Sequence, residues 1–342
     1  MALGNLKRFI KQDVALDLGT ANTLIFLQGE GIVLNTPSVV ALDQDHNVIS
    51  FGGEARRFLG RNPPGINVVR PLKHGVIEDF DAAALFLQSV VDAARRVKPV
   101  FSSRIVLCVP SQLTQVEKRT LLEAARGAGF SRISLLEEVM AAAIGAGVNV
   151  AQKEPSMVVD IGGGTTEVAV IAEMAYLFCR SRRIAGDEMD KAIAHFMLER
   201  HGLRIGPITS ERVKWEIGST AASYETFGST MEVAGQDVEE KIPSYRIVTG
   251  QEIQEALADT VDHVIASVTD CISALPPGLI ESIEKSCILL TGGGSLLRGF
   301  PDLLEKRTGI KVCQPKSPLT SVVEGAGKTL SNFEFYSPAF AN

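Results

Sequence analysis

Short apolar runs alternate along this chain with longer stretches of helical periodicity, a pattern that predicts alternating strands and helices. The apolar runs, each long enough for one buried strand, occupy residues 14–16, 24–27, 105–109, 157–159, 168–171 and 287–290. The helical segments are 81–97 (with Asp81 as the expected N-cap), 115–128, 137–147, 186–200, 210–217 and 251–273. Residues 33–75 are less regular, and residues 219–246 are polar and strand-like. The chain is therefore predicted to have an α/β fold.

One heptapeptide pattern occurs twice, each time between two of the apolar runs. Residues 17–23 read Asp-Leu-Gly-Thr-Ala-Asn-Thr, and residues 160–166 read Asp-Ile-Gly-Gly-Gly-Thr-Thr. This order predicts two β-hairpins, each with a carboxylate exposed at the end of its first strand. Turn conformation alone explains one such copy, because Asp and Gly are common in turns. Two copies in matching contexts favour a polyphosphate and its divalent cation held from both sides.

The doubled hairpin resembles the two phosphate loops of the actin/Hsp70/sugar-kinase ATPase superfamily. On this basis Asp17 and Asp160 are expected to hold Mg²⁺ through water, while backbone N–H groups bind the phosphates of ATP or ADP. The residues that supply these groups are Gly19, Thr20, Ala21 and Asn22 in the first turn and Gly162, Gly163, Gly164 and Thr165 in the second.

Two other motifs gain meaning beside this pair. Residues 290–299 form a strand followed by a Gly-rich turn and a helix; the usual interpretation is a dinucleotide fold, but the GxGxxG spacing is absent. The segment resembles the adenosine motif of the superfamily, which implies nucleotide contacts from Gly292, Gly293, Gly294 and Ser295. Glu211 and Lys214 share one helix face and alone predict an exposed surface ion pair. They also resemble a Glu-x-x-Lys that holds adenosine in Hsp70-like ATPases, whereas Trp215 is expected to pack against a neighbour.

Two adjacent carboxylates, Glu137 and Glu138, precede an Ala-rich helix. Acidic residues in a first helical turn complement the helix dipole without any further role. The functional interpretation is that Glu138 positions the water that attacks the γ-phosphate, while Thr165 donates to that phosphate or orients the water. Neither phosphate loop carries a lysine, so we expect hydrolysis to be slow.

In their order these motifs are most similar to the MreB family of bacterial actin homologues, over residues 13–330. The similar strings are residues 18–24, 70–77, 160–170, 183–190 and 290–299. Val139 departs from the family pattern, which has Pro after the paired Glu, and Thr36 stands where a Glu is usual.

The resemblance implies an actin-like ATPase fold of two related domains, each with an inserted smaller subdomain. The expected division is 13–32 with 76–145 (core), 33–75 (small), 146–181 with 247–342 (core) and 182–246 (small). It also implies filaments that direct cell-wall synthesis and rod shape, with partners among the membrane proteins of cell elongation. The alternatives are a small-molecule kinase of the same superfamily and a diverged MreB paralogue with another scaffolding role. A chaperone ATPase would need a longer C-terminal region.

Composition narrows the class further. A chain of 342 residues suggests two domains, and a net charge of −6 argues against a nucleic-acid partner. The five cysteines and five histidines show no metal-ligand or disulfide spacing. No apolar run reaches the roughly 18 residues of a membrane span, and no signal-peptide pattern is present. A cytoplasmic protein is therefore expected.

Residues 1–12 predict a short amphipathic helix that lies on a membrane surface. One arc of it carries Leu3, Leu6, Phe9 and Ile10, flanked by basic residues. Docking of this helix on its own domain, or a frayed terminus, is the alternative. Val100 and Phe101 form an apolar pair in an expected surface loop, at the position of a membrane loop in the MreB family. Together they predict peripheral attachment to the inner face of the cytoplasmic membrane.

Overall fold

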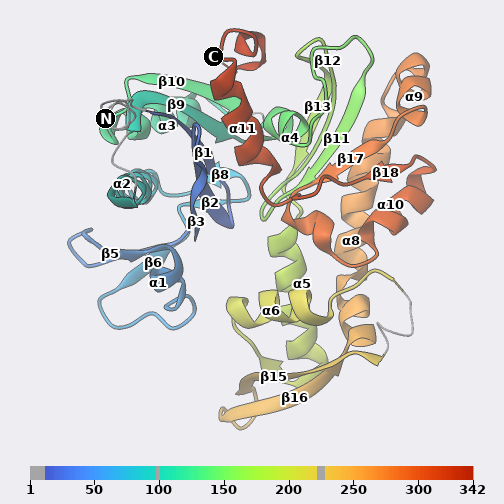
Figure 1. Ribbon diagram of the computed structural model, residues 1–342. Helices are drawn as coiled ribbons and strands as arrows, with labels where there is room; N and C mark the ends of the chain where they lie inside the picture. The colour runs from blue at the N-terminus through green and yellow to red at the C-terminus, as the bar shows by residue number, and fades with distance from the viewer. Residues whose placement is uncertain (1–11, 98–100, 112, 222–227, 342) are drawn as a thin grey trace, which may run out of the picture.

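The two halves of the chain each form a five-stranded sheet with the same pattern of strand pairing (Figure 1). This computed structural model describes residues 12–97, 101–111, 113–221 and 228–341, with the backbone alone for 101–103. The first sheet has the order β10–β9–β1–β2–β3, with bounds Arg132–Glu137, Phe101–Val109, Gln12–Leu18, Asn22–Leu27 and Gly31–Pro37. The second has the order β18–β17–β11–β12–β13, with bounds Val312–Cys313, Ile288–Thr291, Ser156–Ile161, Thr166–Ala172 and Ala175–Arg182.

In both sheets the first three strands in that order are parallel to one another, and each of the last two is antiparallel to the strand before it. Both predicted hairpins are confirmed, because β1 pairs with β2 and β11 pairs with β12 in antiparallel register. The chain is thus an internal repeat at the level of topology as well as of motif.

Alternation along the strands gives each sheet an outer and an inner face. In the first sheet Val14 and Leu16 face an outer core shared with helices α2 (Phe80–Val97) and α3 (Gln115–Gly127). The outer core of the second sheet includes residues of α5 (Gly186–His201), α6 (Pro207–Ile217), α8 (Gly250–Ser273), α9 (Pro277–Glu284) and α10 (Phe300–Thr308). Ala15 and Val158 instead face a central core that joins the two halves. Asp17 and Asp160 lie two positions further along the same strands and so face this central layer too.

Helices α4 (Glu138–Gly145) and α11 (Ser321–Ser331) fill the central layer and cross at glycines. A Cβ at Gly325 would lie 1.8 Å from the carbonyl oxygen of Ala141, and one at Gly145 would lie 1.8 Å from that of Ser321. Lys328 donates to the carbonyl oxygens of Ile144 and Gly145 at 3.0 and 2.7 Å, which satisfies the C-terminal end of α4. The backbones of the two helices are therefore in direct contact.

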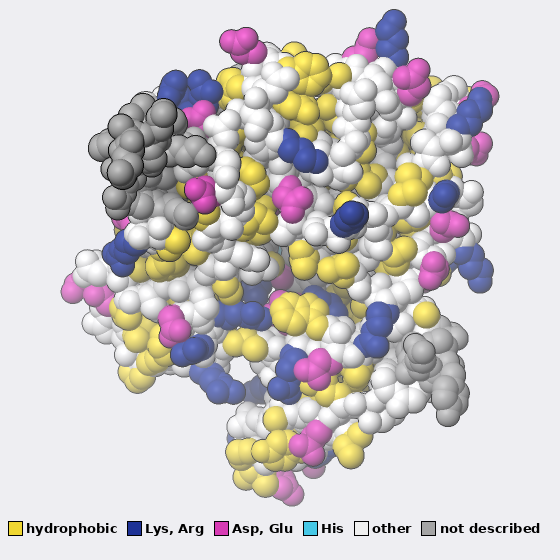
Figure 2. All heavy atoms as spheres, viewed as in Figure 1, with side chains coloured by type: hydrophobic (Ala, Val, Ile, Leu, Met, Phe, Trp, Pro, Cys, Tyr) yellow, Lys and Arg dark blue, Asp and Glu magenta, His cyan; other side chains and the backbone are white. Residues whose placement is uncertain are grey.

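Two smaller units project from the same side of the molecule (Figure 1). One contains β4 (Val40–Leu42), β5 (Val48–Phe51), β6 (Asn67–Val69) and α1 (Gly52–Arg56), followed by the hairpin β7 (Leu72–Lys73) and β8 (Val76–Ile77). The other contains β14 (Leu203–Arg204), β15 (Thr230–Asp237) and β16 (Pro243–Thr249), beside α5 and α6. Figure 2 shows Lys and Arg side chains around the hollow between them.

Some local predictions differ from the structure. Helix α2 begins at Phe80, and the carboxylate of Asp79, not of Asp81, accepts the N–H of Ala82 at 2.9 Å. The predicted strand 105–109 is longer and begins at Phe101, paired with Gln12, so Phe101 is not in a loop. The segment after β17 forms a 3₁₀ turn, η2 (Gly293–Leu296), and the helix begins only at Phe300. A second 3₁₀ turn, η3 (Ser337–Ala339), lies near the end of the chain, and within the described residues no helix is long and apolar enough to cross a membrane.

Candidate functional site

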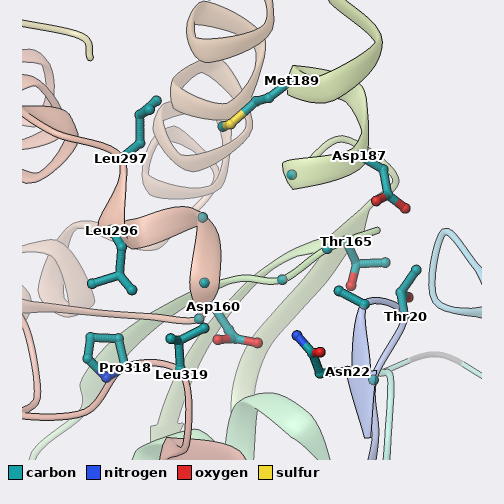
Figure 3. Close-up of a pocket in the computed structure, with 18 of the residues that line it drawn as sticks. Thr20, Asn22, Asp160, Thr165, Asp187, Met189, Leu296, Leu297, Pro318 and Leu319 are labelled. Atoms are coloured by element: carbon teal, nitrogen blue, oxygen red, sulfur yellow. The ribbon is translucent and has the colours of Figure 1, made fainter. Parts of the chain in front are cut away.

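A cavity of about 520 Å³ lies between the two halves, and both hairpin turns line it (Figure 3). Asp17 and Asp160 occupy the same position in the two repeats, opposite Leu24 and Glu167 respectively. Their side chains are 8% and 5% exposed, so the expectation of exposed carboxylates was wrong. Both residues line the cavity.

The two turns approach each other closely. A Cβ at Gly163 would lie 2.9 Å from Cβ of Ala21, and one at Gly164 would lie 2.7 Å from Cα of His74. Figure 3 shows Thr20 and Thr165 beside each other at this junction. Most of the predicted loop residues line the cavity, namely Gly19, Thr20, Ala21, Asn22, Gly162, Gly163 and Thr165. Gly164 is packed against the other half instead, and the N–H of Gly162 is donated to the carbonyl oxygen of Thr165 at 2.8 Å.

The buried carboxylates of Asp17 and Asp160 would be stabilised in their ionised form by a nearby cation. Burial raises the pKa of Asp17 to about 7, and burial together with the charge of Asp17 raises that of Asp160 to about 7. Atom Oδ1 of Asp160 is buried without a hydrogen-bond partner among the described residues. Within those residues no cluster of three or more potential ligand side chains occurs. Two carboxylates that face one cavity suit a cation such as Mg²⁺, which retains much of its water shell.

Glu138 is the first residue of α4 and lines the same cavity. Burial raises its pKa well above the usual range, and the charges of Asp17, Glu167 and Asp160 add to this effect. Val139, the departure from the family pattern, is fully buried in the central core. Thr36, the second departure, is a buried residue of β3 and does not line the cavity.

The far end of the cavity is apolar. Gly292, Gly293 and Gly294 line it together with Leu296, Leu297, Pro318 and Leu319 (Figure 3). Gly292 has φ = 83°, and a Cβ there would lie 2.3 Å from the carbonyl oxygen of Ile161, so glycine allows this turn to pack on the end of β11. Ser295 does not line the cavity, because its hydroxyl turns back to the carbonyl oxygen of Gly292 at 2.6 Å.

Glu211 and Lys214 both line the cavity from α6, but they do not pair with each other. Lys214 Nζ lies 2.8 Å from Asp190 and donates to the carbonyl oxygen of Gly186 at 2.9 Å. Glu211 pairs with Arg56 of the other small unit. The interpretation as an exposed surface ion pair was therefore wrong. Trp215 is 61% exposed at the cavity edge, and it packs against a neighbour as expected, because the guanidinium of Arg56 lies over its ring at 5.9 Å from the ring centre.

Among the described residues, two ion pairs and one histidine–carboxylate contact cross between the halves near the cavity. Besides Arg56 with Glu211, Arg70 lies 3.1 Å from Asp187, and Nδ1 of His74 lies 3.8 Å from Glu188. Asp187 and Glu188 belong to the first turn of α5. The two halves are thus linked by side chains beside the hairpin turns.

Sequence reasoning missed several lining residues. Gly186, Asp187, Met189 and Asp190 fall in a string already noted for its resemblance, 183–190, and that string was the available signal. Pro318, Leu319 and Val322 carry no motif and reach the cavity only through tertiary packing. Among the expected membrane residues, Leu3, Leu6, Phe9, Ile10 and Val100 lie outside the described residues, and Phe101 is described in its backbone only.

Known proteins resemble this chain in sequence and in fold. The family model for the MreB/Mbl protein matches residues 11–337. The cell shape-determining protein MreB of Escherichia coli (strain K12) is 42% identical over 97% of this chain and 97% of its own length. The structure of MreB5 of Spiroplasma citri bound to AMPPNP superposes with a TM-score of 0.88 at 28% identity, over 95% of this chain and 97% of that one. A chain of the MamK double helical filament has a TM-score of 0.76 at 20% identity, over 94% of this chain and 98% of that one. The predicted actin-like fold is confirmed.

Proposed function

Because this chain belongs to the MreB/Mbl family, we propose that it is a cytoskeletal protein that binds ATP, hydrolyses it slowly and assembles into actin-like filaments. The observation that carries the proposal is the pair of equivalent hairpin turns, which meet over one cavity with a buried carboxylate behind each. A nucleoside triphosphate presents the chain of anionic groups that such turns bind, and the charge of its bound cation would balance that of the two carboxylates.

The cavity divides into a polar and an apolar end. At the polar end, residues 19–22, Gly163 and Thr165 would bind the phosphates, and Asp17 and Asp160 would hold Mg²⁺ through its water shell. At the apolar end Leu296, Leu297 and Leu319 suit the flat face of a purine. Lys214 and Glu211, between the two, would supply polar contacts to the nucleoside; Glu211 would exchange or share its contact with Arg56. The MreB5 relative, solved with AMPPNP, supports nucleotide binding.

Hydrolysis requires an oriented water and a group that attracts its proton. Glu138 enters the cavity from the first half and Thr165 from the second, so the two could act on one water between them. Mg²⁺ would neutralise charge on the phosphates. Glu138 must be ionised to attract a proton, and its raised pKa lowers the fraction that is ionised unless a cation lies nearby. This coupling favours slow turnover that depends on full assembly of the site.

Self-association is the part of the proposal that rests most on the family. One observation supports it: Ile242, Tyr245 and Ile247 are exposed near and along β16, an edge strand of the second small unit. An apolar row on an open edge is a liability in a monomer and a suitable contact between copies. The name of the Escherichia coli relative, a cell shape-determining protein, supports a role in cell shape, and we propose that the filament acts as a scaffold for cell-wall synthesis.

We also propose that the filament lies in the cytoplasm on the inner face of the membrane. The basic amphipathic pattern of residues 1–12 supports this. Membrane proteins of the cell-elongation machinery are the proposed further partners.

Sedimentation of the purified full chain tests the proposal. With Mg-ATP and no phosphoryl acceptor, the protein should pellet and release phosphate, whereas Asp160→Ala should do neither. Phosphate transfer to a sugar or acetate, with no pelleting at any concentration, would instead indicate a small-molecule kinase.

A further inference from the structure

The internal repeat of this protein breaks at one buried position. In the first hairpin Asp17 is opposite Leu24, and in the second Asp160 is opposite Glu167. Leu24 is an ordinary apolar residue for such a strand, whereas Glu167 is a carboxylate with 0% exposure. A buried carboxylate is costly unless it is hydrogen-bonded, so its presence in only one copy calls for a reason.

Both oxygens of Glu167 are bonded to the other half of the molecule. The N–H of Ser111 donates to Oε1 at 2.8 Å, and the hydroxyl of Ser111 donates to Oε2 at 3.1 Å. Ser111 follows β9 in the first half, and Glu167 belongs to β12 in the second. Ser111 is itself only 5% exposed. This contact therefore joins the two sheets from the inside, in addition to the side-chain contacts between the halves near the cavity.

The contact lies beside the groups proposed for hydrolysis. A Cβ at Gly75 would lie 2.6 Å from the methyl group of Thr165 and 3.5 Å from Pro110. Pro110, which precedes Ser111, and Thr165 therefore pack against the same glycine. The charge of Glu167 also reaches Glu138, whose pKa it helps to raise. Thr165 comes from the second half and Glu138 from the first, so contacts between the halves set the distance between them. The bonds between Glu167 and Ser111 are such a contact, and Glu167 lies two residues after Thr165 in the chain.

We propose that Glu167 is a positioning residue that anchors the second phosphate hairpin to Ser111, so that Thr165 and Glu138 are held in register for attack on the γ-phosphate. This inference rests on the proposed ATPase function. It assigns Glu167 no contact with the nucleotide. The first hairpin needs no such anchor, because Glu138 already belongs to the same half.

The experiment compares Glu167→Leu, which copies the first repeat, with Glu167→Gln and Ser111→Ala in the full-length protein. Turnover is measured as phosphate release, and nucleotide affinity with a fluorescent ATP analogue. Glu167→Leu should lower kcat about 10-fold or more, because small displacements of catalytic groups are costly, while affinity stays within about 3-fold. Glu167→Gln should recover most of the turnover, since its amide can accept from the N–H of Ser111 and donate to its hydroxyl. Ser111→Ala keeps the backbone bond and should show an intermediate loss.

Val168→Ala is the matched control for a merely structural effect. Val168 is the next residue of β12, and its buried side chain faces the outer core instead. This variant should lower the melting temperature without lowering kcat. The inference is overturned if Glu167→Leu keeps normal kcat, if kcat and affinity fall together, or if Glu167→Gln is as impaired as Glu167→Leu. Glu138→Ala, measured in parallel, distinguishes failure of this inference from failure of the proposed hydrolysis. Normal turnover in Glu138→Ala would refute the proposed hydrolysis itself, and the inference with it.

Discussion

Substitution of Gly325 by Ala should destabilise the protein, although alanine is the better helix former. Gly325 lies inside α11, where Ala in place of Gly ordinarily adds about 1 kcal/mol of stability. Here the new Cβ would lie 1.8 Å from the carbonyl oxygen of Ala141, whereas real contacts are essentially never under 3.0 Å. The two helices would have to separate by about 1.2 Å, the difference between these two distances.

The strain cannot be relieved by a rotamer change, because the contact is with backbone. Overpacking of a core typically costs about 1–3 kcal/mol, and we expect the upper end, or roughly 2 kcal/mol net of the helix propensity. Thermal unfolding followed by circular dichroism should show a melting temperature lower by about 3 °C. Glu138 begins α4, so the displaced helix should also lower ATP turnover.

Two further variants sharpen this test. Gly278→Ala, in the exposed first turn of α9 with nothing within 4 Å of a new Cβ, should be neutral or slightly stabilising. Gly145→Ala should resemble Gly325→Ala, and the double variant should lose less than the sum, because one displacement relieves both contacts. A Gly325→Ala protein as stable and as active as the original would refute the reasoning.

Three other predictions concern the cavity and the membrane. The pKa values of Asp17 and Asp160 are raised in the folded protein, so the unfolded chain loses the protons of these two carboxyl groups at lower pH than the folded protein does. In nucleotide-free protein with EDTA, the free energy of unfolding should therefore fall as pH rises from about 4 to about 7. Melting temperatures at pH 5.5 and 7.5 check this, and Asp160→Ala should narrow the difference while abolishing stabilisation by Mg-ATP; an unchanged difference would contradict it. Arg56→Ala should speed release of a fluorescent nucleotide several-fold, because it removes a contact between the halves, whereas Arg57→Ala, which loses only an exposed pair with Glu54, should not; equal rates for the two would count against it. Removal of residues 1–11, which leaves β1 intact, combined with Val100→Ser and Phe101→Ser should abolish ATP-dependent co-sedimentation with anionic liposomes, and normal co-sedimentation would exclude the membrane proposal.

Local chemistry explains what could be predicted about the site. The hairpins around Asp17 and Asp160 follow from strand periodicity and glycine turns, both of which operate over a few residues. Glu138 was placed at the start of a helix for the same reason. The same local reasoning could not show that Ser295 turns away from the cavity or that Gly164 packs against His74, because both depend on what lies beyond the turn.

The sequence by itself determined the two halves, their hairpin turns and the family, because each depends on short motifs in a recognisable order. Only the tertiary structure decided which groups meet between the halves. Glu211 and Arg56 are separated by 155 residues, and Glu167 and Ser111 by 56, so no local pattern pairs them. The glycine contact of α4 with α11 also joins residues that are far apart in the sequence. How the halves pack decides whether a carboxylate is exposed at a strand end or buried against a cavity, because burial depends on what the rest of the chain places over it.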